Sequence, residues 1–167
     1  MSVKPDMPII IDIEASGFGT GSYPIEVGVA FADGDSYCTL IKPEPEWMHW
    51  NEAAQSLHGI EREQLIKHGR GVDVVARQLN ESLNGKTVYS DAWGNDMVWV
   101  SLLFHHAGLM QTFTVDALPK LLSEEQKAIW SRTKQKVIEE YGFNRHRASS
   151  DARILQMTYC QTLAALD

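Results

Sequence analysis

The sequence predicts an α/β fold with a mixed five-stranded sheet flanked by helices. Three β-rich segments come first, at 8–14, 24–32 and 36–42, with short connections between them. Strand and helix patterns then alternate to the end of the chain. An antiparallel meander followed by alternating strands and helices is typical of a sheet whose later strands run parallel to the first.

The opening strands are indicated by composition and by turn signals. Segment 8–14 reads Pro-Ile-Ile-Ile-Asp-Ile-Glu, and its β-branched run predicts a buried strand. Residues 15–22 are rich in Gly and Ser and predict a loop. Asp33-Gly34-Asp35 predicts a tight turn between the second and third strands.

Helical periodicity and capping residues indicate the remaining elements. Asn51 is a candidate cap for a short helix, and Ser123 and Gly142 bound a longer one. The expected helices are 51–56, 72–84, 96–107, 123–141 and 147–165, and the expected further strands are 86–90 and 112–116.

Composition favours one domain over residues 1–167, because the chain is long enough to bury a hydrophobic core. No apolar run approaches the length of a membrane helix and the N-terminus lacks a secretory pattern, so we expect no membrane association and a cytoplasmic location. Cys38 and Cys160 are too few for a disulfide framework or a zinc site. The net charge of −7 argues against a broad duplex-binding face and favours short or single-stranded nucleic acid ends.

The first candidate site is Asp12-Ile13-Glu14. Strand alternation places both carboxylates on one face, where they repel each other and resist burial. A divalent cation would offset that cost, because Mg²⁺ and Mn²⁺ prefer carboxylate oxygens. The alternative is an exposed strand end with two solvated acids.

The second candidate site comes late in the chain, where His146 lies five residues before Asp151. An acid in the first turns of a buried helix can face a metal. Histidine suits the removal of a proton from water, because its side chain gains and loses a proton near neutral pH. The alternative is local electrostatics at a helix N-terminus.

The third candidate site follows the strand at 86–90. Asp91 ends that strand and Asp96 starts the next helix, so either can reach a site at the strand ends. Helix capping is the alternative explanation for Asp96.

Together these segments resemble the three motifs of the DEDDh family of proofreading-type 3′→5′ exonucleases (DnaQ-like). Asp12-x-Glu14, followed by Ala15-Ser16-Gly17, is similar to the first motif, Asp96 to the second-motif acid, and His146-x4-Asp151 to the third. The segment starting Leu57-His58-Gly59-Ile60 is similar to one common in the polymerase III epsilon-like branch. The resemblance covers residues 8 to 165 and implies a ribonuclease H-like fold.

The second motif departs from the family pattern. The family usually reads His-Asn-x-x-Phe-Asp, whereas this chain has Asp91-Ala-Trp-Gly-Asn-Asp96, which keeps only the acid. We prefer Asp96 as the ligand because it lies five residues past the strand end and opens the helix, as the family acid does. Asp91 remains the rival.

The resemblance implies hydrolysis of the terminal phosphodiester with two divalent ions, Mg²⁺ or Mn²⁺. Asp12, Glu14, Asp96 and Asp151 would bind the metals and His146 would be the general base. Substrate contacts are expected from the residues near these motifs: Ala15 and Ser16 through the backbone, Phe18 by stacking on the last base, His58 near the phosphate, and Trp93, the tryptophan nearest the site. Instead of contacting substrate, Phe18 could anchor its loop in the core, and His58 could be an ordinary exposed histidine.

Three functions remain open. The first is a free-standing 3′→5′ exonuclease on single-stranded DNA, RNA or short oligonucleotides. The second is a proofreading or repair subunit beside a polymerase, for which we expect a partner-binding tail that the chain lacks. The third is a non-catalytic binder, which has no need of four convergent carboxylates. The sequence leaves open whether the chain forms a homodimer and whether it prefers DNA or RNA.

Overall fold

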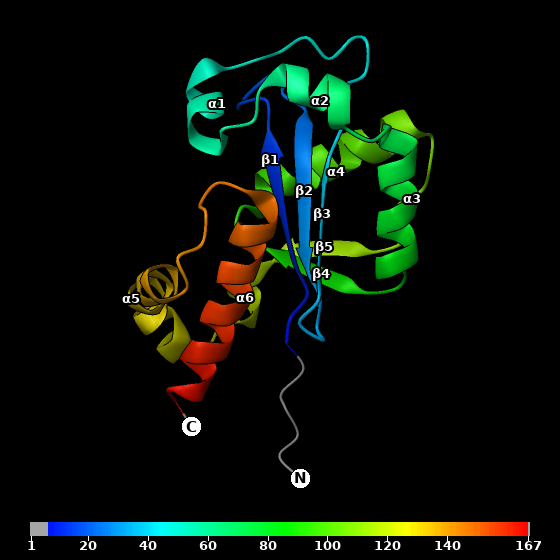
Figure 1. The fold of residues 1–167 in the computed structure, drawn as a ribbon. Helices are drawn as coiled ribbons and strands as arrows, with labels where there is room; N and C mark the ends of the chain where they lie inside the picture. The colour runs from blue at the N-terminus through cyan, green and yellow to red at the C-terminus, as the bar shows by residue number, and fades with distance from the viewer. Residues whose placement is uncertain (1–6, 167) are drawn as a thin grey trace.

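The computed structural model describes residues 7–166 and contains a five-stranded mixed sheet with the strand order β3-β2-β1-β4-β5 (Figure 1). Three strands form an antiparallel meander, and two more extend the sheet parallel to β1. The meander comprises β1 (Ile10–Ala15), β2 (Pro24–Ala30) and β3 (Ser36–Leu40), and the parallel strands are β4 (Thr87–Ser90) and β5 (Thr114–Ala117). The predicted fold class is confirmed.

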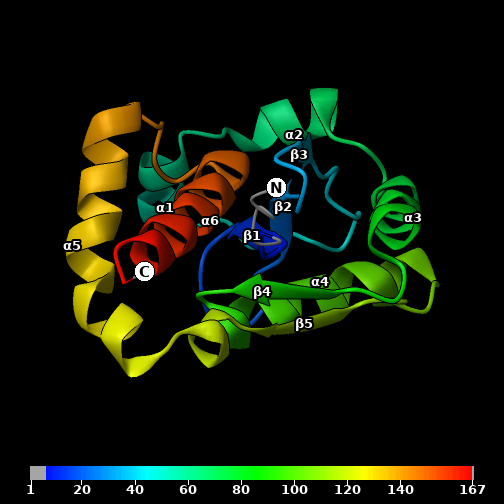
Figure 2. The same cartoon turned by 90° about the horizontal axis from the view of Figure 1, so that it is seen from below.

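The two faces of the meander bury different elements, because successive side chains of a strand alternate between faces. Ile11, Ile13 and their β2 neighbours belong to the large core that includes α3 (Val72–Leu83) and α4 (Trp93–Ala107). On the other face, Ile10 packs with residues of α6 (Ala148–Ala164). α5 (Glu124–Tyr141) lies beside α6 at the edge of the molecule (Figure 2). Alternation therefore places Asp12 and Glu14 on the α6 side.

Two short helices lie beyond the end of β1, α1 (Glu52–His58) and α2 (Arg62–His68) (Figure 1). The predicted cap of α1 is confirmed, since the side chain of Asn51 accepts a hydrogen bond from the Ala54 amide at 3.0 Å. The sequence did not predict α2. Its capping box joins Glu61 to Gln64, and glutamate is outside the residues that usually cap a helix.

Of the long helices, only α4 departs from its expected bounds by more than one residue. α5 has the predicted Ser123 cap and ends at Gly142, whose φ of 61° is the left-handed conformation that glycine adopts without strain. α4 begins at Trp93, three residues before the predicted start. Asp96 therefore lies one turn inside α4. A 3₁₀ turn at Leu118–Leu121 links β5 to α5.

No helix within residues 7–166 is both long enough and apolar enough to span a membrane.

Candidate functional site

Carboxylates from a strand and a helix converge beside the end of β1. Asp12 and Glu14 are on β1, and Asp151 is in the first turns of α6. Asp12, Glu14 and Asp151 each offer an oxygen within 4.8 Å of the others. Residues far apart in the sequence thus form one acidic cluster that could hold a metal ion.

Asp12 is the most enclosed acid of this cluster. Its side chain is only 9% exposed, and its Oδ2 atom is buried with no hydrogen-bond partner among the described residues. Burial raises the pKa of Asp12 well above its ordinary value, and the charges of Asp96, Glu14 and Asp151 add to that increase. The alternative of a solvated strand end is wrong for Asp12. An unpartnered buried carboxylate oxygen is what a bound cation would satisfy.

Glu14 is held near its neutral form in the same way. Burial, followed by the charges of Asp151 and Glu26, raises the pKa of Glu14 to about 8, against a smaller opposite effect of Arg147. Like charges at short range disfavour ionisation of each member, so the cluster as a whole favours a compensating positive charge.

Asp96, on α4, lies outside the set of acids whose oxygens are within 4.8 Å of one another, but its charge helps to raise the pKa of Asp12. It is 1% exposed, and burial raises its pKa to about 7 despite a 2.6 Å hydrogen bond donated by Ser90 Oγ. The N-cap of α4 is Ala92, which has no side-chain capping bond, so the helix-cap explanation of Asp96 is wrong.

Asp91 lies on the outer side of the cluster. Its carboxylate is 39% exposed and pairs with Lys134 Nζ at 3.4 Å. It lines a small cavity of about 60 Å³ together with Asp12 and Asp151. Asp96 instead lines the main cavity described below.

The loop before α6 presents His146 beside Asp151. The His146 amide donates to Asp151 Oδ2 at 3.1 Å, and Arg145 Nε donates to Oδ1 at 3.2 Å. His146 has a φ of 61°, the sole positive φ of a non-glycine residue in the described chain. This conformation costs a non-glycine residue energy, and His146 lines the main cavity.

The sequence analysis missed Glu26, which connects β2 to the start of α6. Glu26 is fully buried and accepts hydrogen bonds from Arg147 Nε and Nη2, the shortest at 2.6 Å, and from the Ala148 amide at 2.7 Å. It pairs in register with Glu14 on β1. The available signal was an acid inside the apolar strand Pro-Ile-Glu-Val-Gly-Val-Ala.

A main cavity of about 550 Å³ opens beside the acids. Phe18, 72% exposed, lies along it with its ring 6.0 Å from that of Trp99, so the core-anchor alternative is wrong. His58 is 5% exposed, so it is not an ordinary surface histidine. Its Nδ1 accepts from the Ile60 amide at 3.0 Å, whereas Nε2 is buried with no partner within the described residues. Ala15 and Leu57 also line the cavity.

Two expected substrate contacts lie elsewhere. Ser16 is fully buried, its amide donates to the Tyr23 carbonyl and its carbonyl accepts from Asn51, so its backbone is already used. Trp93 does not line the cavity, because its indole donates to the Val115 carbonyl at 3.0 Å on β5. Trp99 is the tryptophan that borders the site.

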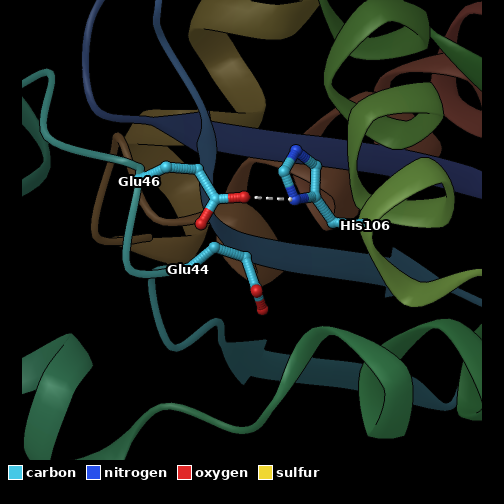
Figure 3. Close-up of side chains that lie close together, drawn as sticks. All are labelled: Glu44, Glu46 and His106. Atoms are coloured by element: carbon cyan, nitrogen blue, oxygen red, sulfur yellow. Dashed lines mark ion pairs between the residues drawn. The ribbon is translucent and has the colours of Figure 1, made fainter.

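A second cluster consists of Glu44, Glu46 and His106, the last of these in the final turn of α4 (Figure 3). Trp47 Nε1 can only donate, and it contacts His106 Nε2 at 3.3 Å. His106 Nδ1 therefore carries the proton and donates to Glu46 at 3.2 Å. In this tautomer neither ring nitrogen is free to bind a cation.

No protein-family model matches the chain, and no curated protein matches its sequence. Solved structures of exonuclease I are similar in three dimensions. One exonuclease I structure matches with a TM-score of 0.71 and 11% identity over 96% of this chain and 41% of that one. E. coli exonuclease I in complex with a dA16 oligonucleotide matches with a TM-score of 0.67 and 10% sequence identity. That match covers 96% of this chain and 43% of the exonuclease chain. The zinc-bound complex of E. coli exonuclease I with single-stranded DNA matches with a TM-score of 0.62 and 11% sequence identity. That match covers 96% of this chain and 39% of the exonuclease chain.

The chain has a ribonuclease H-like fold. It spans about two fifths of the length of these exonuclease I chains. In the ribonuclease H-like sheet, the acids of β1 lie beside the parallel strand β4, and the start of α4 follows that strand. The fold therefore brings the second acidic segment toward the first, although about 80 residues separate them in the sequence.

Proposed function

We propose that the chain is a metal-dependent 3′→5′ exonuclease of the DEDDh type that acts on single-stranded nucleic acid. The observation that carries this proposal is the cluster of Asp12, Glu14 and Asp151 beside a nucleotide-sized cavity. Asp96 lines the same cavity, and its charge helps to raise the pKa of Asp12. The likeness in fold to exonuclease I supports it. Single-stranded DNA, RNA and short oligonucleotides all fit the proposal.

The four carboxylates repel one another, and a divalent ion, Mg²⁺ or Mn²⁺, would relieve that repulsion. Asp12 has a buried oxygen without a partner, and the pKa values of Asp12, Glu14 and Asp96 are all raised. When bound, such ions supply Lewis-acid stabilisation of the scissile phosphate and an activated water. We take Asp96 as the fourth ligand over Asp91, because Asp91 is half exposed and paired with Lys134.

The remaining residues bind the 3′ end and move a proton. His146 accepts the proton of the attacking water, and the bonds from its amide and from Arg145 hold Asp151 beside it. Phe18, Leu57 and Trp99 form an apolar wall for the terminal base, which favours stacking without sequence choice. His58 also lines the cavity and, because Nδ1 accepts from the Ile60 amide, it carries its proton on Nε2.

The test is cleavage of a 5′-labelled single-stranded oligonucleotide with a free or a blocked 3′ end. We expect shortening from the free end only, dependence on Mg²⁺ or Mn²⁺, and loss of about 10³-fold in rate in Asp12→Asn, equivalent to roughly 4 kcal/mol of transition-state stabilisation. Glu81→Gln, an exposed acid on α3, is the matched control and should keep the full rate. Equal cleavage by Asp12→Asn, or cleavage in chelator, would contradict the proposal.

A further inference from the structure

One side of α5 continues from the acidic cluster as a stripe of basic and aromatic side chains. Lys127, Trp130 and Lys134 fall on this side, since residues three, four and seven apart share a face of a helix. A lysine on the outer side of a surface helix is ordinarily solvated. The structure instead half-buries Lys134 against Asp91.

Three cavities connect this stripe to the proposed cleavage site. The main cavity and the small cavity of about 60 Å³ share Asp12. The small cavity and a third one of about 210 Å³ share Asp91. Lys134 and Arg145 line the small cavity, and Trp130 and Lys127 line the third. The two smaller cavities lie along α5 and share lining acids with each other and with the main cavity, and together they are called the α5 groove.

Three cations line this groove and can meet a phosphodiester chain: Lys127, Lys134 and Arg145. Lys127 pairs with the exposed Glu124 at 2.7 Å, and Asp91 and Asp151 also line the groove. The protein carries a net charge of −7, and the acidic cluster repels phosphate. Lys134 Nζ has one carboxylate partner at 3.4 Å, and that carboxylate is itself 39% exposed, so a phosphate can share or replace it. Trp130 packs on the apolar cluster of Ile10 and Leu155 but stays partly exposed, which leaves an aromatic surface available to a base.

We propose that the α5 stripe of Lys127, Trp130 and Lys134 binds the nucleotides on the 5′ side of the scissile phosphate. Lys134 contacts the phosphate nearest the acids, and Trp130 stacks on a base further along the strand. Lys127 to Lys134 spans about 10 Å at 1.5 Å per residue, which suits a short run of single-stranded nucleotides rather than a long duplex. This inference rests on the proposed exonuclease function, which supplies the polarity of the strand.

Binding is measured without cleavage, in the Asp12→Asn background, by fluorescence anisotropy with a 5′-labelled single-stranded 10-mer. We expect Lys134→Ala and Trp130→Leu each to weaken binding of the 10-mer at least about fivefold, the lower end of the range for base–aromatic stacking. Lys134→Ala should also reduce the slope of log affinity against log salt by about 0.7, as loss of one phosphate contact predicts.

Two controls separate this groove from the rest of the molecule. Lys136→Ala removes an exposed charge roughly half a turn away on α5 and should leave binding unchanged. Thymidine 5′-monophosphate, which fills the terminal-nucleotide cavity alone, should compete equally well in all variants. Circular dichroism checks that Trp130→Leu folds, and Trp130→Phe should keep most of the affinity.

Failure of this inference differs from failure of the proposed function. Equal 10-mer binding by Lys134→Ala, Trp130→Leu and their parent overturns the α5 groove, and cleavage by the unmodified chain then leaves the exonuclease proposal intact. If the parent binds the 10-mer through α5 but the unmodified chain never cleaves, the groove stands as a single-strand binding site and the exonuclease proposal falls. If no oligonucleotide binds, both are overturned.

Discussion

At the scale of single residues, the site is built from groups that are costly to the fold. Asp12 has an unpartnered buried oxygen, Asp96 is almost fully enclosed, and His146 has left-handed backbone dihedrals. Each of these features destabilises a folded protein unless something compensates for it. Their concentration around one cavity is the pattern expected of a functional site rather than of a structural core.

The conformation of His146 allows its proton-transfer role to be separated from its structural role. Asparagine tolerates the left-handed region, and its amide N–H can still donate to Asp151. We therefore expect His146→Asn to keep the stability of the parent and to lower the cleavage rate by about 10²–10⁴-fold, the usual contribution of a general base. Steady-state kinetics and thermal denaturation of the same samples check both expectations. A rate within threefold of the parent, roughly, would remove His146 from the proposed base role.

The residues of the candidate site differ in how far the sequence could identify them. Asp12, Glu14, His146 and Asp151 are candidates because their spacings, taken together, resemble the family's motifs, and strand alternation places the first two on one face. Glu26 and Lys134 do not, because their importance comes from partners 121 and 43 residues away. Spacing within one segment cannot report such pairs.

At the scale of elements, the site depends on how closely α6 approaches β2. Glu26 and Gly28 lie on the same face of β2, and Glu26 holds the first residues of α6. A Cβ atom on Gly28 would lie 2.2 Å from the carbonyl carbon of Ala148. Because Gly28 has no side chain, α6, which carries Asp151, can contact β2 at Gly28. Gly28 is the residue paired with Asp12 on β1.

Substitution of Gly28 tests this contact. Because the clash is with backbone, α6 must shift, and we expect Gly28→Ala to lower the free energy of unfolding by about 1–3 kcal/mol and to lower the cleavage rate as Asp151 moves. Gly94→Ala is the matched control, since nothing lies within 4 Å of a Cβ atom there and alanine favours the α4 helix. Urea denaturation and the cleavage assay measure both variants. Equal stability of Gly28→Ala and Gly94→Ala would contradict the close approach.

Helix starts were harder to predict than strands. The structure contains all five of the expected strands, although β3 has only one β-branched residue. α2 is seven residues long and is capped by a glutamate, so neither its periodicity nor its cap is a strong signal. α4 begins at Trp93 without any side-chain cap, which explains why the acid at 96 was taken as its start.

At the scale of the whole molecule, the acidic cluster makes folding stability depend on pH and on cations. Asp12, Glu14 and Asp96 all have raised pKa values in the folded chain, mainly because they are buried. An unfolded chain ionises these groups near their ordinary values, whereas the folded chain keeps the protons to higher pH. Unfolding therefore releases protons, and stability falls as pH rises through this interval.

The last prediction follows from this sign. In chelator, we expect the melting temperature to decrease as pH rises from about 4.5, the ordinary pKa of glutamate, to about 8, the value reached by Glu14. Mn²⁺ or Mg²⁺ should raise the melting temperature most at the high end of this range, because the ions bind the ionised cluster of the folded chain. Differential scanning fluorimetry across pH, with and without metal, gives both curves.

Glu14→Gln should flatten the chelator curve and weaken the response to metal, whereas Glu81→Gln should change neither. A melting temperature that rises with pH in chelator would mean that the acids are ionised in the folded chain without a cation. The cluster would then not be built around a cation, even if the chain proved to be a nuclease.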